Sequence, residues 1–263
     1  PIYLEPMSEK TGWTEQDVPD QTGKVIIVTG GNSGIGYETV RILALRGAHV
    51  ILAARNAIKG DEAVNEILSE DPSANVETQP LDLADLSSIR KFASSFKERG
   101  IPLHTLINNA GIIGPLPYFE NTFKQHYGTI DYDVWADVFK TNLFGPVKMA
   151  ETFLDQIEKG QDKKMVFISS VGGSIADDHQ KAFAYATSKT ALNKSVALMA
   201  DILKEREVKV LAMCPGYVKT RMNGGGANLE PEESIKGMLK QIEKLDLKSS
   251  GSFVRYNGES INW

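Results

Sequence analysis

The chain has almost no cysteine and no long apolar run. Cys214 is the only cysteine among the 263 residues, so a disulfide framework is excluded and a reducing, cytoplasmic location is the simplest expectation. No apolar stretch approaches the ~20 residues that cross a bilayer, and the first residues lack a signal-peptide pattern. The few histidines lack metal-ligand spacing, so no metal is expected at His49, His104, His126 or His179.

Positive charge is not in excess either. The chain carries 29 Lys and Arg against 34 Asp and Glu, a net charge of −5. This balance argues against a nucleic-acid-binding protein that relies on broad attraction to phosphates. The composition, 41% hydrophobic and 24% charged, is that of an ordinary soluble globular protein. The length allows one large α/β domain or two small ones.

From residue 24 onward, strand-like apolar runs alternate with helix-like segments. Strict alternation predicts a single-domain, doubly wound, Rossmann-type α/β fold, a parallel sheet with helices on both faces. Residues 1–22 are polar and proline-dotted, and we expect an N-terminal arm outside the core of a domain spanning 23–263. The expected strands are 24–30, 48–54, 75–82, 103–111, 164–170, 208–216 and 251–258, and the expected helices are 35–46, 57–70, 83–100, 131–159, 181–206 and 231–245.

A glycine-rich turn, "VTGGNSGIGYE", connects the first expected strand to the first expected helix. Glycines tolerate positive φ and lack a Cβ, so Gly30, Gly34 and Gly36 would let a pyrophosphate approach the backbone. The N-terminus of the following helix favours that anion. The turn has neither the Lys and Ser/Thr of a P-loop after Gly36 nor the common G-x-G-x-x-G order. Its position after a buried strand still predicts dinucleotide binding.

"FAYATSKTAL" places a lysine on the apolar face of a helix, one turn after a tyrosine. Tyr185, Lys189, Leu192, Val196 and Leu203 share one face at helical spacing, and that face otherwise resembles core. Fully buried lysines are rare. One interpretation is structural: the lysine stem covers the core while its ammonium reaches water. The other is a tyrosine and lysine that act together.

These motifs, taken in order, resemble the signature of the short-chain dehydrogenase/reductase family over about residues 23–257. The family motif Thr-Gly-x-x-x-Gly-x-Gly matches 29–36, and "NNAG", "TNLFG", "FISS", "YATSK" and "CPGYVKT" follow in the family's order. The first half is similar to retinol-dehydrogenase-like and WW-domain-oxidoreductase-like members, and the second half to C-factor-like members. The resemblance places the cofactor against Gly30, Ser33, Gly34, Ile35, Gly36, Arg55, Asn56, Asp82, Leu83, Asn109, Ala110, Gly111, Tyr185, Lys189, Pro215, Gly216, Val218 and Thr220.

The resemblance also implies four catalytic residues. Tyr185 would act as the general acid/base, and the Lys189 ammonium would lower its pKa and bind the nicotinamide ribose. Ser170 would hold the substrate oxygen, and Asn142 would complete a water-linked proton relay. Ser170 and Tyr185 lie further apart than is usual in the family. Between them we expect a loop over the substrate side, formed by Asp177, Asp178, His179 and Lys181. His179 is expected to be solvated in this loop.

The end of the second expected strand bears on the choice of cofactor. NAD-preferring dinucleotide folds place an acid there to bind the ribose 2′-hydroxyl, whereas this chain has Ala54. Arg55 offers a planar, permanently charged fork that matches a 2′-phosphate, and Asn56 and Lys59 are near enough to assist. NADP(H) is therefore the preferred cofactor, with NAD(H) possible. The alternative is that Arg55 points to solvent.

Together these features predict an NADP(H)-dependent carbonyl reductase or alcohol dehydrogenase with a small-molecule carbonyl or alcohol substrate. The alternative is a non-catalytic nucleotide-binding regulatory or signalling protein of the same fold. A hydrolase is disfavoured because no G-x-S-x-G elbow is present. We expect a homodimer or homotetramer built through 131–159 and 181–206, a substrate loop at 223–228, and a buried, unreactive Cys214.

Overall fold

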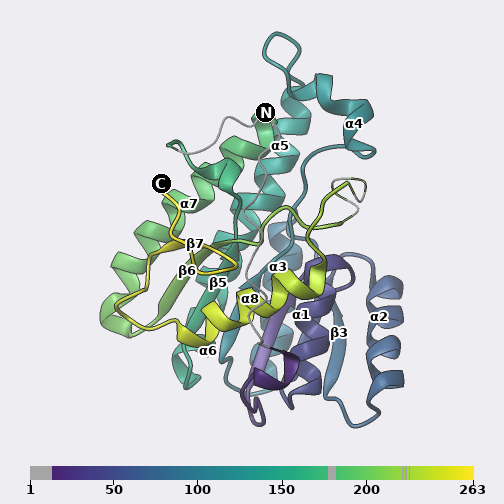
Figure 1. Ribbon diagram of the computed structural model, residues 1–263. Coiled ribbons are helices and arrows are strands. Elements are labelled where there is room, and N and C mark those ends of the chain that lie inside the picture. Colours follow the sequence, from purple (N-terminus) through teal and green to yellow (C-terminus); the bar gives the residue numbers. More distant parts are fainter. Residues whose placement is uncertain (1–13, 177–181, 221, 223, 225) are drawn as a thin grey trace.

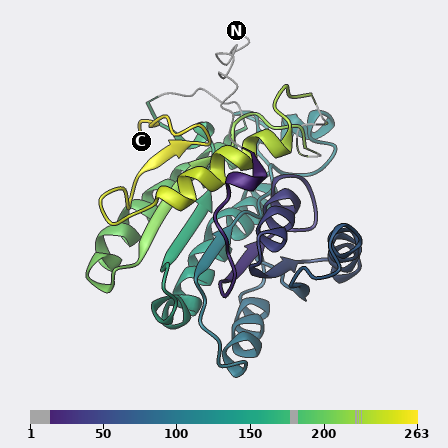
Figure 2. The same ribbon diagram turned by 60° about the horizontal axis from the view of Figure 1, so that its bottom comes forward.

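Every pair of neighbouring strands in the central sheet runs parallel. The computed structural model describes residues 14–176, 182–220, 222, 224 and 226–263. Within these residues seven strands form one sheet in the order β3-β2-β1-β4-β5-β6-β7. Figures 1 and 2 show helices on both faces of this sheet. The expected doubly wound α/β fold is therefore confirmed.

The elements follow the expected alternation closely. The strands are β1 (Val25–Thr29), β2 (His49–Ala54), β3 (Val76–Pro80), β4 (Thr105–Asn108), β5 (Lys164–Ile168), β6 (Lys209–Cys214) and β7 (Phe253–Arg255). The helices are α1 (Gly34–Leu45), α2 (Ala57–Glu70), α3 (Leu86–Glu98), α4 (Tyr118–Asn121), α5 (Tyr132–Phe139), α6 (Gly145–Lys159), α7 (Phe183–Leu203) and α8 (Pro231–Lys244).

The strands are buried on both faces of the sheet. Their sequences are therefore continuous apolar runs and do not alternate between apolar and polar residues. In β1 all five residues are buried, and successive side chains enter opposite cores. Ile27 packs in the core under α3, α6 and α7, whereas Ile26 and Val28 pack in the core under α1, α2 and α8. The helices supply the matching apolar stripes, as Phe96 and Phe153 do with ring centroids 5.4 Å apart.

The order of the strands fixes where a ligand can bind. The chain leaves β1 toward β2 and β3 on one side, then returns to β4 on the other side of β1. In open α/β sheets the crevice beyond the carboxyl ends of the two strands at such a reversal is the place for a ligand. The ends of β1 and β4 carry the two most characteristic sequence motifs, the glycine turn and "NNAG".

Two stretches differ from the expected elements. The long helix expected over 131–159 consists of α5, a π-helical turn over Lys140–Phe144, and α6. A short helix, α4, and a 3₁₀ turn over Thr122–Gln125 fill the segment after β4 that the sequence left without structure. π turns inside helices often mark functional sites, and this one contains Asn142.

The described part of the expected N-terminal arm lies against the core. Val18 is 3% exposed and belongs to the core under α1 and α8. The Gln21 N–H donates to the Arg46 carbonyl at 2.8 Å, and the Arg46 Nε donates to the Val18 carbonyl at 2.8 Å. Residues 14–22 are thus fastened to the end of α1 by hydrogen bonds and by one buried apolar side chain, which their polar composition did not predict.

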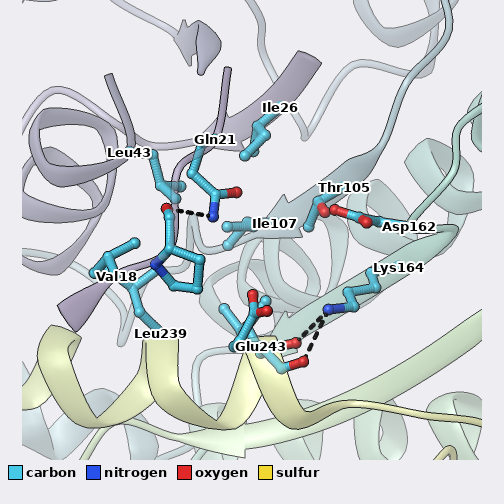
Figure 3. Close-up of a pocket in the computed structure, with 12 residues that line it drawn as sticks. Val18, Gln21, Ile26, Leu43, Thr105, Ile107, Asp162, Lys164, Leu239 and Glu243 are labelled. Atoms are coloured by element: carbon cyan, nitrogen blue, oxygen red, sulfur yellow. Dashed lines mark hydrogen bonds between the residues drawn. The ribbon is translucent and has the colours of Figure 1, made fainter. Parts of the chain in front are cut away.

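The amino end of the sheet holds a small cavity on the side of α8. It encloses about 30 Å³ and is lined by residues that include Ile26, Thr105 and Lys164 (Figure 3). That volume suits one or two water molecules rather than a metabolite. Lys164 Nζ donates to the carbonyls of Ile242 and Glu243 at 2.7 and 3.2 Å, at the negative end of α8. The cavity therefore lies beside the Lys164 ammonium that caps the end of α8. This end of the sheet is remote from the glycine turn.

His104, also at this end, supplies a pH-dependent contribution to stability. Its side chain is buried, and Nδ1 accepts a hydrogen bond from the Val25 N–H at 2.9 Å. Burial lowers the pKa of His104 below its ordinary value. Between the folded and unfolded pKa values the unfolded chain binds more protons, so this contribution is present above about pH 6.5 and is lost as the pH falls.

We predict that His104→Asn, which keeps an acceptor for Val25 but cannot titrate, weakens this acid sensitivity. Urea unfolding of both proteins from pH 8 to pH 5 checks it. The parent should lose more stability than the variant over the acidic part of that range. Parallel curves at all pH values would show that His104 is not the source.

Candidate active site

Thr29 ties the carboxyl ends of β1 and β4 together. Its buried hydroxyl accepts from the backbone N–H groups of Asn109 and Ala110, both at 3.0 Å. The Asn109 side chain donates back to the Thr29 carbonyl at 2.9 Å. These bonds hold the "NNAG" loop against the glycine turn, so two motifs that are 80 residues apart in sequence form one surface.

The glycine turn has the backbone shape that its sequence predicts. Gly30 and Gly34 adopt positive φ angles of 67° and 56°. A Cβ on Gly36 would lie 2.3 Å from the Gly30 carbonyl oxygen, and a Cβ on Gly30 would lie 3.0 Å from the Cα of Ala110. Only glycine fits such close approaches of backbone to backbone.

The start of α1 faces the crevice without a side-chain cap. Ser33 is the N-cap residue, and its side chain makes no capping hydrogen bond to the helix. The first N–H groups of an α-helix lack partners inside the helix and attract anions. The turn over Gly34, Ile35 and Gly36 therefore fits a diphosphate, the group that joins the two halves of a dinucleotide.

The segment after β6 closes the crevice from the side of α8. Gly216 has a φ of 83°, and a Cβ there would lie 2.8 Å from the Leu229 side chain. The Pro215 carbonyl accepts from the Ser234 hydroxyl at 2.6 Å, and Val218 pairs with Leu229 as an isolated bridge. The segment brings Thr220 next to the glycine turn. A Cβ on Gly34 would lie 3.4 Å from the Thr220 Cγ2.

The adenosine side is open at the ends of β2 and β3. Ala54 is buried, whereas Arg55 is exposed and makes no ion pair with the described residues. Asn56 caps α2, accepting from the Lys59 N–H at 3.0 Å, so its amide oxygen is already in use. After β3, Asp82 accepts from the Ala84 N–H at 2.9 Å. Leu83, which follows it, is buried.

The residues around the glycine turn thus fit a dinucleotide. The cradle is shaped by glycines, its anion-binding N–H groups belong to α1, and Arg55 stands free at the end of β2. The pyrophosphate would lie on the α1 N-terminus, and the nicotinamide end would extend toward Gly111 and Lys189.

Asn142 holds the loop that follows β4. It is fully buried in the π turn, and its side chain contacts both backbone groups of Ile112: Oδ1 accepts from the N–H and Nδ2 donates to the carbonyl, each at 2.8 Å. Nδ2 also lies 3.1 Å from the Ser188 hydroxyl on α7. The amide therefore links the π turn, the "NNAG" loop and α7.

Ser170 lies two residues beyond the end of β5 and interacts with Tyr185. Its hydroxyl accepts from the Gly172 N–H at 3.1 Å, and its side chain acts to lower the pKa of Tyr185. Cys214 is the last residue of the neighbouring strand β6, and its thiol accepts from the Val171 N–H at 3.3 Å. Cys214 is 3% exposed, as expected for a small residue filling an apolar position.

Lys189 is buried rather than extended to water, so the interpretation of its ammonium as solvated is wrong. The residue is 3% exposed, and Nζ donates to the Ile168 carbonyl at 2.7 Å. Nζ lies 5.7 Å from the centroid of the Tyr185 ring, and 3.4 Å from where a Cβ on Gly111 would be. Burial lowers the pKa of Lys189 to about 8.

The pKa of Tyr185 moves in the direction opposite to the expected one. Burial raises it to about 12, and the effect of the Ser170 side chain offsets only part of that rise. The expectation considered the charge of Lys189 and not the burial of the Tyr185 ring. Burial acts against the charged forms of both groups, the Tyr185 phenolate and the Lys189 ammonium.

Gln125 is a site residue that the sequence did not indicate. Its side chain is 1% exposed and contacts the backbone of both Ile113 and Tyr185. The only sequence signal would have been indirect: α7 starts after Ala182, which has no side-chain oxygen to cap a helix.

Some expected residues lie outside the described part of the chain. These are the four residues of the loop between β5 and α7, Asp177, Asp178, His179 and Lys181, and two residues of the expected substrate loop, Asn223 and Gly225.

The described residues contain no cluster of metal ligands and no membrane-spanning helix. Nowhere among them do three His, Cys, Asp or Glu side chains gather as metal ligands would. None of the helices in that part of the chain combines the length and apolar character required to cross a bilayer.

Sequence comparison finds relatives among oxidoreductases. Human WW domain-containing oxidoreductase is 39% identical over 158 residues, which are 60% of this chain and 36% of that protein. Mouse retinol dehydrogenase 12 is 35% identical over 208 residues, 74% of this chain and 62% of that protein. An uncharacterised oxidoreductase of Schizosaccharomyces pombe is 28% identical over 261 residues, 91% of this chain and 98% of its own length. The chain thus matches only part of the first two proteins.

Solved structures share the whole fold. The NADPH-bound carbonyl reductase from chicken fatty liver superposes with a TM-score of 0.81 at 29% identity, covering 92% of this chain and 100% of that one. The carbonyl reductase Sniffer of D. melanogaster gives 0.79 at 24% identity, with 92% and 100% covered, and at that identity it supports the fold alone.

The short chain dehydrogenase family model matches residues 24–229, which include the first six strands and the glycine turn between β1 and α1. With that match over most of its length, the chain belongs to the short-chain dehydrogenase/reductase family of oxidoreductases.

Proposed function

We propose that this protein is an NADP(H)-dependent oxidoreductase that transfers hydride between the nicotinamide and a carbonyl or alcohol substrate. The observation that carries the proposal is the meeting of Ser170, Tyr185 and Lys189 beside Gly111, beyond the carboxyl ends of β4 and β5. A hydroxyl, a phenol and an ammonium there can manage the proton and the charge that a reacting carbonyl oxygen requires.

The cofactor would supply or accept the hydride, and the chain's own residues would manage the proton. With its pKa raised to about 12, the Tyr185 phenol is protonated at neutral pH and can donate to a carbonyl oxygen. Ser170, whose side chain acts on the pKa of that phenol, would hold the same oxygen and stabilise its developing charge. Lys189 would contact the ribose and stabilise the phenolate after proton transfer.

Asn142 supports this chemistry by position. Its side chain makes hydrogen bonds to Ile112 and Ser188, so it fixes the loop that borders the nicotinamide end of the site. The water-linked relay assigned to Asn142 by family resemblance stays a prediction. So does the cytoplasmic location expected from the single cysteine.

The alternative, a non-catalytic nucleotide-binding protein, differs in one measurable respect. Such a protein would bind NADPH without oxidising it in the presence of any carbonyl compound. The complete Asn142, Ser170, Tyr185 and Lys189 set favours turnover, and a panel of aldehydes and ketones assayed with NADPH and with NADH distinguishes the two functions.

We predict that Tyr185→Phe lowers kcat by roughly 10²–10⁴-fold, the usual contribution of a general acid. The change removes only the phenol oxygen and keeps the ring, so the Kd for NADPH should stay within about twofold. Tyr127→Phe, at a tyrosine that is 91% exposed, is the matched control and should leave both values unchanged. Lys189→Met should instead weaken NADPH binding and turnover together. Activity of Tyr185→Phe close to that of the parent would contradict the assigned role.

Cofactor preference gives a separate prediction. Ala54 offers no acceptor for a ribose 2′-hydroxyl, and the exposed Arg55 is free to bind a 2′-phosphate. Loss of one charged hydrogen bond costs about 1.5–3 kcal/mol, about one to two decades in affinity. Ala54→Asp combined with Arg55→Val should therefore shift the ratio of kcat/KM for NADPH to that for NADH by at least about tenfold toward NADH. An unchanged ratio would show that Arg55 does not bind the 2′-phosphate of NADPH.

We also propose a homodimer or homotetramer that assembles through α6 and α7. Leu198 and Ile202 on α7 are 50% and 70% exposed, and Phe144 at the start of α6 is 51% exposed. Light scattering at micromolar concentration should give a multiple of 28.8 kDa, and Ile202→Glu should reduce it. Ile58→Glu on α2, at a residue that is 71% exposed, is the control. A parent mass of 28.8 kDa would contradict the assembly.

A further inference from the structure

The segment after β4 has one fully buried side chain, and it is an amide. Within residues 118–131 the other side chains are exposed or only partly covered, and aromatic ones such as Phe123 and Tyr127 face water. Gln125, at the end of the 3₁₀ turn, is 1% exposed. A polar group is buried at a net cost unless its hydrogen bonds are satisfied, so its partners indicate what it does there.

The two ends of the Gln125 amide contact two different parts of the candidate active site. Nε2 donates to the Ile113 carbonyl at 2.6 Å, in the loop that follows β4. Oε1 accepts from the backbone N–H of Tyr185 at 3.2 Å, 60 residues away on α7. Ile113 follows Ile112, whose backbone N–H and carbonyl both form hydrogen bonds with the Asn142 side chain. Gln125 therefore joins the Asn142-bound loop to the residue proposed as the general acid.

The bond to Tyr185 also completes the start of α7. The N-terminal N–H groups of a helix have no partner inside it, and a Ser, Thr, Asp or Asn at the N-cap usually supplies one. Here the N-cap is Ala182, and it provides no side-chain hydrogen bond. Gln125 supplies the missing acceptor from a distant segment, and the N–H that it satisfies is that of Tyr185 itself.

Space for this amide is made by a glycine. Gly114 has a φ of 134°, and a Cβ there would lie 2.7 Å from Gln125 Nε2. Any other residue at this position would strain the backbone and push the amide away from Ile113. The backbone of the loop and the side chain of Gln125 are thus fitted to each other.

We propose that Gln125 is a positioning residue, which fixes the backbone of Tyr185 relative to the loop 111–114 and so sets the distance from the phenol to the reacting oxygen. The assignment of a catalytic role to Tyr185 rests on the proposed function. The placement of the Tyr185 backbone by Gln125 does not. A displacement of a catalytic group by about 1 Å can lower turnover about 10²-fold without a change in binding.

The test uses two substitutions and a matched control in the full chain. Gln125→Leu removes both hydrogen bonds. Gln125→Glu keeps the acceptor for Tyr185 but, when ionised, sets a carboxylate against the Ile113 carbonyl. Gln156→Leu removes another buried glutamine side chain, from α6 at the opposite end of the sheet. Gln156 is 5% exposed, and its side-chain oxygen accepts from Lys159 Nζ at 3.4 Å.

Amide hydrogen exchange is the first measurement, because it does not require turnover. The Tyr185 amide should exchange at least about tenfold faster in Gln125→Leu than in the parent, as expected when its hydrogen bond is lost. Gln156→Leu should leave the Tyr185 amide unchanged. Parent-like exchange in Gln125→Leu would overturn the proposal, whatever the protein's activity proves to be.

Turnover is the second measurement. Gln125→Leu should lower kcat roughly 10- to 100-fold with the KM for NADPH within about twofold, whereas Gln156→Leu should change neither. The kcat ratio of Gln125→Glu to the parent should rise as the pH falls, since a protonated carboxyl can again donate to Ile113. The charged and ionisable groups nearby, among them Tyr185 and the Lys124–Asp131 pair, are present in the parent as well, so the parent's pH profile is the reference.

The outcomes separate the two proposals. A parent that turns over no carbonyl compound but shows the predicted exchange at Tyr185 rejects the proposed function and keeps the role of Gln125 in placing the backbone. An active parent in which Gln125→Leu lowers kcat no more than Gln156→Leu does rejects the positioning role. If Gln125→Leu does not fold, Gln125→Glu decides, and a kcat ratio independent of pH then counts against the proposal.

Discussion

The candidate active site is organised around an ammonium group that has almost no access to water. Lys189 is 3% exposed, and a buried charge is strongly unfavourable unless polar groups surround it. The Ile168 carbonyl, at the end of β5, accepts one of its hydrogens. Gly111 leaves room beside Nζ that a side chain would fill, and a cofactor ribose could enter there. The raised pKa of Tyr185 and the lowered pKa of Lys189 both follow from this shared burial.

Two amide side chains fix the positions of the backbone segments around the buried Lys189 and Tyr185. Asn142 and Gln125 hold consecutive residues of the loop after β4, one from the π turn and one from the 3₁₀ turn. Each also reaches α7, Asn142 at the Ser188 hydroxyl and Gln125 at the Tyr185 N–H. A loop fixed at two adjacent positions and tied to α7 has little freedom to move independently. The irregular elements that carry the two amides therefore matter more to the site than the regular helices beside them.

The sequence predicted the sheet, the helices on its faces and the glycine turn, because these depend on local patterns. A strand buried on both faces, as β1 is, shows as an apolar run, and a turn that needs positive φ shows as glycine. It could not predict the π turn around Asn142 or the role of Gln125, because those depend on hydrogen bonds between residues 30 to 60 apart. The direction of the Tyr185 pKa was missed for a related reason: burial depends on what the whole fold packs around the ring.

The two ends of β5 show how the same side chain serves different purposes. Lys164 begins the strand, and its ammonium donates to two carbonyls at the negative end of α8, beside a cavity that is too small for a metabolite. Lys189 donates to the carbonyl of the last residue of the strand and has one such partner among the described residues. An ammonium has three hydrogens, so Lys189 retains donors that a ligand could use. Burial alone therefore does not mark a functional lysine. The difference lies in the unused donors and in the glycine that leaves space beside them.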